Sequence, residues 1–486
     1  MDTKSLLKRD SRNSICFSPL GNQKLEYLLQ KNSRDLEYQI AWLNHHMQHI
    51  IIGICYYCCT ALMVSATLIH YQSYPIMVRV AKSAAMGINV NLGIIAIPVA
   101  KNLISSLRAS IFRHFLPLKQ AMFVHNMAGY HILYFSIVHV AAHCLNYLDI
   151  AKVYGDLNDF KPESLLLTTL PGYTGLTLSL LLFLMMTAIP TRKHNFEIFY
   201  YSHKLAIPIM IISLFHGVGC FVNQFIGMKC HYYAYKFVPW SLGIYLIELV
   251  IVKLFQRAPA LIKSYKWISN DTMELVLSPS SILTREPGSY VFLNCPQISK
   301  YQNHPFTLTN PRDKANLTLE IKAVGDWTNN LTHLIEFEMD QLIVEGPYNS
   351  TSVDLKSFNT LILIGQGIGV TPFKAMIQQV IMDYENNMTA IPRIELVTLY
   401  KNEEDRTEIM ESDEFQLPHI NISSYTKSKC WPPKFDEIFS NVHHSSRNQS
   451  VGVFVCGSDC LGNLIEQMCL EYSRDERQFI YTNESF

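Results

Sequence analysis

The chain has 486 residues, of which 49% are hydrophobic and only 16% are charged. Its 40 Lys and Arg side chains balance 40 Asp and Glu side chains, so the formal net charge at pH 7 is +0. This balance gives no sign of the basic composition typical of a nucleic-acid-binding protein, and the length allows two or three domains.

Six apolar runs occupy the first half of the chain, each long enough or nearly long enough to cross about 30 Å of hydrocarbon. They lie near 48–71, 88–107, 121–146, 172–190, 196–219 and 237–255. Basic residues such as Arg108, Arg192 and Lys253 fall together on one side of this arrangement. The positive-inside bias therefore predicts an integral membrane protein, in the plasma membrane or an endomembrane, with both termini in the cytoplasm.

Histidines recur within two of these runs. His125 and His139 are 14 residues apart, which separates them by roughly 21 Å along a helix and by only about 40° around it. His203 and His216 are 13 residues apart, and Pro208 between them is expected to kink the helix and correct their phase. Two parallel helices of this kind would offer two stacked pairs of imidazoles.

Paired neutral imidazoles are typical axial ligands of an electron-transferring haem. We therefore expect His125 with His203 to bind an inner haem, and His139 with His216 to bind an outer one. His143, one turn beyond His139, is a candidate for a catalytic role beside the outer haem. The alternative is that these histidines only form hydrogen bonds with neighbouring helices. His131 is expected to point to a different side.

The loop after the fifth run contains two cysteines, Cys220 and Cys230, on the expected non-cytoplasmic face. An oxidising compartment would favour a disulfide between them. The spacing alone also allows two free thiols.

After residue 257 the long apolar runs end, and shorter apolar segments separated by turn residues follow. Segments such as MELVLS, SYVFLN and LTLEIKAV predict an antiparallel β-barrel up to about residue 350. Alternating strands and helices then predict a doubly wound parallel α/β sheet. The expected domains are a cytoplasmic tail (1–45), a six-helix transmembrane haem bundle (46–257), a barrel domain (258–352) and an α/β domain (353–486).

Glycine-rich turns in the last domain predict a dinucleotide site. Gly365, Gly367 and Gly369 follow a strand and precede Thr371-Pro372 at the start of a helix. Backbone amides and the helix dipole at such a place can receive a pyrophosphate. A second turn at Cys456-Gly457 ends a later strand, beside which a nicotinamide would lie.

These features together resemble the transmembrane flavocytochromes that include NADPH oxidase catalytic subunits and ferric reductases. The similarity runs from about residue 75 to 486. It rests on the four histidines and on the segments AAHCLN (141–146), FEIFYYSH (196–203), HPFTLT (304–309), VGDWT (324–328), EGPY (345–348), GQGIGVTPF (365–373), VFVCG (453–457) and FIYTNESF (479–486).

The resemblance implies the cofactors FAD, two b-type haems and the electron donor NADPH, together with the fold of a ferredoxin-reductase-like module. It assigns FAD to residues of the barrel and to the last aromatic residue: His304, Pro305, Phe306, Thr307, Leu308, Thr309 and Phe486. It assigns NADPH to the glycine turns and to a cation that would meet the 2′-phosphate: Gly365, Gly367, Gly369, Thr371, Pro372, Lys401, Cys456 and Gly457.

The implied activity is electron transfer from cytosolic NADPH across the membrane to molecular oxygen, giving superoxide and, from it, hydrogen peroxide. Relatives often work with a small membrane partner and cytosolic activators. The resemblance implies the same kinds of partner for this chain. Two alternatives stay open, a ferric or cupric reductase on the same electron path and a non-catalytic membrane scaffold or conductance.

The sequence departs from the family pattern at four positions. Lys82 and Lys101 stand where relatives carry arginine near the haems, and lysine is not an equivalent partner for a propionate. Gln366 replaces a usual proline in the glycine turn, and Asn349 replaces a usual glycine after EGPY. These departures motivate the scaffold alternative.

Overall fold

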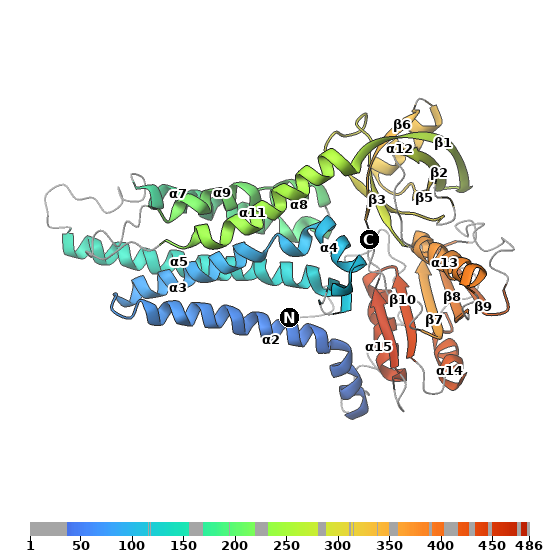
Figure 1. Cartoon of the computed structure of the whole chain (residues 1–486), viewed down its shortest axis with the longest axis horizontal. Coiled ribbons are helices and arrows are strands. Elements are labelled where there is room, and N and C mark those ends of the chain that lie inside the picture. The colour runs from blue at the N-terminus through green and yellow to red at the C-terminus, as the bar shows by residue number, and fades with distance from the viewer. Residues whose placement is uncertain are drawn as a thin grey trace. The chain divides into compact units, whose positions relative to one another are not determined.

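Figure 1 shows the computed structural model of the chain. It describes residues 36–114, 116, 118–154, 169–193, 195–218, 232–279, 288–310, 313, 315–337, 339–348, 358–387, 391–402, 417–426, 433–445, 450–473 and 478–483. The chain divides into two compact units. One is Gln48–Ile251, and the other combines Met1–Met47 with Val252–Phe486.

Helices make up the first unit, as the apolar runs predict. Its main helices are α2 (Leu36–His70, whose first turns belong to the other unit), α3 (Ile76–Ile94), α5 (Ala121–Tyr154), α7 (Leu170–Thr187), α8 (Phe196–His203), α9 (Ala206–His216) and α11 (Ala234–Ile251). Short helices join them: η2 (Ile97–Val99), α4 (Lys101–Ala109), η3 (Ile111–His114), η4 (Leu118–Gln120) and η5 (Ile189–Lys193). Among the described residues, six segments are long and apolar enough to span a membrane, which confirms the predicted number of spans.

The predicted position of the second span is wrong. We expected it near 88–107, but the structure gives Ile76–Val99. Arg79 and Lys82 make the start of this helix look too polar for a bilayer. Half of its apolar window is buried inside the bundle, against 11–22% for the other five spans. Because neighbouring helices cover half of it, this helix accepts polar residues on the covered side.

Close packing joins α3 to α5 within the bundle. A Cβ atom added to Gly87 would lie 2.6 Å from the ring of Phe135, so only glycine allows this approach of the two helices. The carboxylate of Glu248 on α11 accepts hydrogen bonds from the backbone N–H groups of Asn102 (3.1 Å) and Leu103 (2.9 Å). It therefore stabilises the N-terminus of α4, where backbone donors otherwise have no partner.

The fifth span is broken between α8 and α9. Pro208 has no N–H group and its ring collides with the carbonyl four residues earlier, at Lys204. The backbone here forms hydrogen bonds to the residue three positions earlier, as in a 3₁₀ turn. They run from Leu205 N to Ser202 O (3.0 Å) and from Ile207 N to Lys204 O (3.2 Å). The predicted disturbance of the helix by Pro208 is therefore present, and it separates His203 from the helix that carries His216.

An antiparallel six-stranded sheet begins the second unit. Its strands are β1 (Arg257–Ser269), β2 (Thr272–Pro279), β3 (Tyr290–Asn294), β4 (His304–Thr307), β5 (Leu317–Lys322) and β6 (Gln341–Tyr348), in the order β4-β3-β6-β1-β2-β5. A bridge between Leu308 and Leu319 connects the two edge strands. Helix α12 (Asp326–Phe337) adds Trp327, Leu331 and Ile335 to the buried core, as expected of the predicted barrel.

A parallel five-stranded sheet follows. Its strands are β7 (Thr360–Gln366), β8 (Arg393–Tyr400), β9 (Ile420–Thr426), β10 (Ser450–Cys456) and β11 (Gln478–Asn483), and its helices are η8 (Gly367–Val370), α13 (Thr371–Asn387), α14 (Phe435–Ser445) and α15 (Asp459–Tyr472). One core cluster contains side chains of α14 and α15, and a separate one contains those of α13, so helices cover both faces (Figure 1). The order β11-β10-β7-β8-β9 confirms the doubly wound prediction. It reverses between β7 and β10, where ligands of such sheets bind.

Candidate functional site

The structure brings the four predicted haem ligands together in two pairs. The ring centroids of His125 and His203 are 6.0 Å apart, with an angle of 60° between the ring planes. Those of His139 and His216 are 6.1 Å apart, at 66°. Each pair combines α5 with the α8–α9 segment, and the 14-residue spacing on α5 separates the pairs by roughly 21 Å.

Backbone carbonyls orient the two histidines of α5. His125 Nδ1 lies 2.9 Å from the carbonyl of Ile95, and His139 Nδ1 lies 2.9 Å from that of Ala81. A carbonyl oxygen can only accept, so each Nδ1 carries the hydrogen. Each Nε2 therefore keeps its lone pair, which is the tautomer that a metal ligand needs.

His216 is oriented by a side chain instead. The hydroxyl of Thr174 on α7 donates to the carbonyl of Leu170, so its lone pairs face His216 Nδ1 at 2.9 Å. The Nδ1 atom of His203 is buried and has no hydrogen-bond partner among the described residues. Three of the four imidazoles are thus fixed with Nε2 available.

These features fit haem. With metal–nitrogen bonds of about 2 Å, two imidazoles on opposite sides of one ion have ring centroids about 6 Å apart. A mostly apolar cavity of about 330 Å³ is lined by His139, His143, His216 and Lys82. Apolar walls suit the macrocycle, and Lys82 offers a propionate a single amine donor rather than the forked donor of an arginine.

The remaining histidines of α5 differ in their surroundings. The ring of His143 lies 4.6 Å from that of His139, and its buried Nδ1 has no hydrogen-bond partner among the described residues. His131 points elsewhere and forms a 2.9 Å hydrogen bond with the hydroxyl of Tyr56, whose ring stacks on it. His143 therefore belongs to the outer cavity, whereas His131 belongs to the packing of α2 on α5.

Aromatic rings gather at the barrel edge that β4 forms. The imidazole of His304 stacks on Trp327 with centroids 4.0 Å apart, and Phe306 lies 6.2 Å from the same indole. Pro305 is exposed, and the other residues of β4, up to Thr307, are half-buried. A half-open aromatic surface of this kind fits a planar isoalloxazine ring.

Leu308 and Thr309 lie elsewhere. Both are buried, with exposed fractions of 5% and 1%. The backbone N–H of Leu308 donates to Ser289, and both the N–H and the hydroxyl of Thr309 donate to the carbonyl of Thr318. These contacts give both residues a part in closing the barrel, and their assignment to FAD stays a prediction.

Two glycines shape the turn between β7 and α13. Gly367 has a φ of +57°, which a residue with a Cβ rarely adopts. A Cβ on Gly369 would lie 3.0 Å from the carbonyl carbon of Cys456 and closer still to its oxygen, so this turn packs directly against the end of β10. Only backbone atoms fit there, and the backbone N–H groups of such a turn at the start of a helix can bind a pyrophosphate.

A buried carboxylate holds the first turn of α13. The side chain of Glu320 on β5 is fully buried, and it accepts hydrogen bonds from the hydroxyl of Thr371 (2.8 Å) and from Lys374 Nζ (3.0 Å). A hydroxyl has one hydrogen to donate. A phosphate beside Thr371 would therefore receive its hydrogen bonds from backbone N–H groups.

Gln366 connects the two glycine turns. Its side-chain oxygen accepts a 2.8 Å hydrogen bond from the backbone N–H of Ser458. A Cβ on Gly457 would lie 2.9 Å from this side chain. Gln366 thus fixes the loop after β10 next to the turn after β7. Lys401 is exposed directly after β8, at the same carboxyl edge of the sheet.

Sequence reasoning missed three residues with roles in these sites: Thr174, Glu320 and Trp327. Two of them had some signal, because Glu320 is an acid within the apolar strand LTLEIK and Trp327 belongs to VGDWT. Thr174 had none, since it is one of several hydroxyl residues in an apolar helix. Phe486 and the Cys220–Cys230 pair lie outside the described residues.

Three family models match successive parts of the chain. They are a ferric reductase like transmembrane component (residues 91–214), an FAD-binding domain (258–352) and a ferric reductase NAD binding domain (401–470).

Curated relatives match over most of the length. The chain is 25% identical to one superoxide-generating NADPH oxidase heavy chain of Dictyostelium discoideum, covering 84% of this chain and 68% of that one. It is 24% identical to a second such heavy chain of the same organism (93% and 99%) and 26% identical to NADPH oxidase 1 of Mus musculus (84% and 86%). A solved structure of phthalate dioxygenase reductase overlaps 47% of this chain and 68% of its own, with 18% identity and a TM-score of 0.38.

Proposed function

We propose that this chain, which belongs to the transmembrane flavocytochromes of the ferric reductase and NADPH oxidase family, carries electrons from NADPH across a membrane to molecular oxygen. The product of the reaction is superoxide. The observation that carries this proposal is the pairing of four histidines at two depths of one bundle, with two centroid distances near 6 Å. Histidine pairs with this geometry and tautomer have little use in a membrane except to hold haem.

Backbone atoms would form most of the binding site for NADPH, the electron donor. The turn at Gly367 and Gly369 would receive the pyrophosphate of NADPH, and Lys401 would meet its 2′-phosphate. Gln366 would hold the Cys456-Gly457 turn beside the nicotinamide. Glu320 keeps the first turn of α13 fixed against the barrel, so that the nucleotide is oriented toward the flavin.

The flavin end uses the aromatic edge of the barrel. His304, Phe306 and Thr307 would line one side of FAD, with Phe486 stacked on its ring. When bound, FAD supplies the step from hydride to single electrons, and the two haems supply one-electron carriers across the membrane.

The residues of the helical bundle indicate which side of the membrane each haem would occupy. The basic residues of the connecting segments support a cytoplasmic position for both termini, so His125 and His203 would bind the inner haem and His139 and His216 the outer one. His143 and Lys82 would give the outer cavity polarity and positive charge, which favour an anionic product. The name "heavy chain" of two relatives supports a smaller partner subunit, and activation by cytosolic proteins belongs to the same proposal.

A reduced-minus-oxidised visible spectrum of the purified chain, compared with His216→Ala, tests this function. We expect a six-coordinate b-type signal that NADPH reduces and oxygen reoxidises, with superoxide trapped in the medium. His216→Ala should lose about half of the signal and nearly all of the superoxide. His131→Ala is the control, because His131 belongs to no pair and should leave the haem content unchanged.

Two outcomes would contradict the proposal. Haem that NADPH reduces but oxygen does not reoxidise, with ferric chelates reduced at the same rate without oxygen, would establish a metal reductase on the same path. That alternative is favoured by the ferric reductase transmembrane match. A chain that binds neither haem nor flavin would instead establish the non-catalytic scaffold or conductance.

A further inference from the structure

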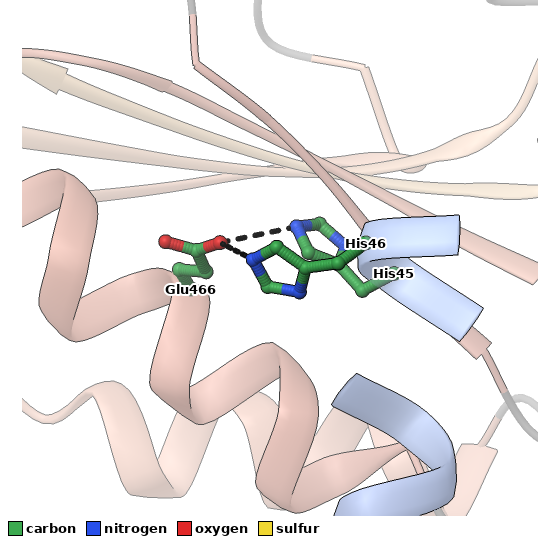
Figure 2. A group of neighbouring side chains, drawn as sticks. All are labelled: His45, His46 and Glu466. Atoms are coloured by element: carbon green, nitrogen blue, oxygen red, sulfur yellow. Dashed lines mark ion pairs between the residues drawn. The ribbon is translucent and has the colours of Figure 1, made fainter. Parts of the chain in front are cut away.

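Three side chains outside the electron path converge on one point (Figure 2). His45 and His46 come from the first turns of α2, and Glu466 comes from α15 of the nucleotide-binding domain. One carboxylate oxygen of Glu466 lies 3.2 Å from His45 Nε2 and 3.6 Å from His46 Nε2. All these groups belong to the same compact unit.

The distances match those of a metal coordination shell. The three ligand atoms all lie within 4.8 Å of one another. Around a tetrahedral ion with bonds of about 2.0–2.1 Å, ligand atoms are about 3.3 Å apart. The separations of 3.2 and 3.6 Å bracket this value, so the carboxylate oxygen and each imidazole nitrogen are spaced as two ligands of one small ion.

The hydrogen bond from His46 Nδ1 to Trp42 directs the other ring nitrogen, Nε2, at the Glu466 carboxylate. His46 Nδ1 lies 3.0 Å from the carbonyl oxygen of Trp42, which can only accept, so Nδ1 carries the hydrogen. In the neutral ring, Nε2 then directs its lone pair at a carboxylate oxygen. Two acceptors facing each other repel, and either a proton on Nε2 or a metal ion between the two atoms makes the contact attractive.

The imidazoles are also held in place. The ring of His46 stacks on Trp42 with centroids 4.4 Å apart and an angle of 21°. The ring of His45 lies 4.9 Å from that of His46 and 5.9 Å from that of Tyr481. The hydrogen bond to Trp42 is the support that metal-binding histidines typically have from a second residue.

The cluster carries negative charge and is open to solvent. The carboxylate of Glu466 supplies the charge, and the three side chains are between one-fifth and one-third exposed, so an ion can enter from solvent. A carboxylate at such a place attracts a divalent cation.

We propose that His45, His46 and Glu466 form a binding site for a divalent transition metal of the zinc class, with a fourth position open to water. Two imidazoles and one carboxylate suit Zn²⁺ and do not suit Ca²⁺ or Mg²⁺, which prefer oxygen ligands. Bound metal joins the start of α2 to α15. The cluster shares no residue with the proposed haem, flavin and nucleotide sites, so its proposal does not depend on the proposed function.

The test is a zinc titration of the full chain in detergent, after chelator treatment and dialysis. We expect the wild type to retain a single zinc ion per chain through gel filtration, and His46→Gln and Glu466→Gln to bind it roughly tenfold or more weakly. His49→Gln is the matched control, since His49 lies on the same helix and packs against Phe123 instead. An unchanged haem spectrum reports that each variant is folded.

X-ray absorption at the zinc edge of the wild type identifies the ligands. Nitrogen and oxygen at about 2.0–2.1 Å, with the scattering pattern of imidazole, would support the site. Sulfur at about 2.3 Å would place the metal on cysteines and overturn it. Equal zinc binding by the wild type and Glu466→Gln, or no binding by the wild type at micromolar zinc, would also overturn the proposal.

Discussion

The membrane bundle and the nucleotide-binding domain build their sites by opposite means. In the bundle, side chains make the site, because four imidazoles project from long helices and three of them are oriented by single hydrogen bonds to Ile95, Ala81 and Thr174. In the nucleotide-binding domain, the backbone makes the site, because Gly367 and Gly369 bring main-chain atoms to the end of the sheet.

This difference predicts where each region tolerates change. A helix survives the loss of one side-chain hydrogen bond, so a substitution in the bundle should affect the cofactor more than the fold. A turn packed directly on backbone has no such freedom, so substitutions there should affect stability and nucleotide use together. The following predictions run from the largest expected effect to the smallest.

Lys374→Met should have the largest effect. It leaves the fully buried carboxylate of Glu320 without its positive partner, and breaking a buried ion pair costs about 3 kcal/mol or more. We expect the urea midpoint of flavin release from the full chain to fall markedly. The double variant Lys374→Met/Glu320→Gln removes the buried charge and should recover part of the loss. Equal midpoints for the single variant and the wild type would show that the pair is not structural.

Gly369→Ala tests the backbone site directly. The added methyl group would collide with the carbonyl group of Cys456, and overpacking of this kind costs about 1–3 kcal/mol. We expect NADPH-driven haem reduction to be nearly lost, while dithionite still gives the full haem spectrum. Gly129→Ala is the control, because a Cβ there meets nothing within 4 Å. Normal NADPH kinetics in Gly369→Ala would remove the turn from the site.

Thr174→Val tests the side-chain site. It removes the hydroxyl that faces His216 Nδ1, and loss of such a supporting hydrogen bond typically weakens metal binding about 10–100-fold. We expect weaker retention of the outer haem and a shifted reduction potential, with normal helix content. Thr177→Val is the control, since its hydroxyl bonds to Tyr173 of its own helix. Identical haem retention in both variants would contradict the role of Thr174.

The substitution Asp271→Asn should have the smallest effect, and it should lower the free energy of unfolding only above acidic pH. Burial acts to raise the pKa of Asp271, but hydrogen bonds from Lys322, Thr272 and Ser269 outweigh burial, so the folded-state pKa is lowered. Its stabilisation is therefore complete above the unfolded pKa of about 3.9 and is lost as the pH falls through the lower folded value. For this partly exposed pair we expect Asp271→Asn to cost at most about 1 kcal/mol at pH 7. Thermal unfolding of the wild type and Asp271→Asn across pH 3–7 measures this cost. An equal difference in stability between the two proteins at pH 3 and at pH 7 would contradict the prediction.

Much of both regions follows from local patterns. The apolar runs predict six spans because hydropathy over about 20 residues decides membrane insertion. The 14-residue spacing of His125 and His139 predicts a shared face because helical periodicity is fixed by the backbone. The break at Lys204 follows from Pro208 alone, and the glycine turn follows from its position between a strand and a helix. The second span was misplaced because hydropathy cannot tell a helix that faces protein from one that faces lipid.

The sequence by itself thus determined the elements, their order and the residue types that face each site. Only the tertiary structure decided which groups meet across elements: Thr174 with His216, Glu320 with Thr371 and Lys374, Gln366 with Ser458, and His45 and His46 with Glu466. It also placed the side chains of Leu308 and Thr309 in the interior of the barrel. The reason is physical, because periodicity and propensity act over a few residues, whereas each of these contacts depends on how distant elements pack.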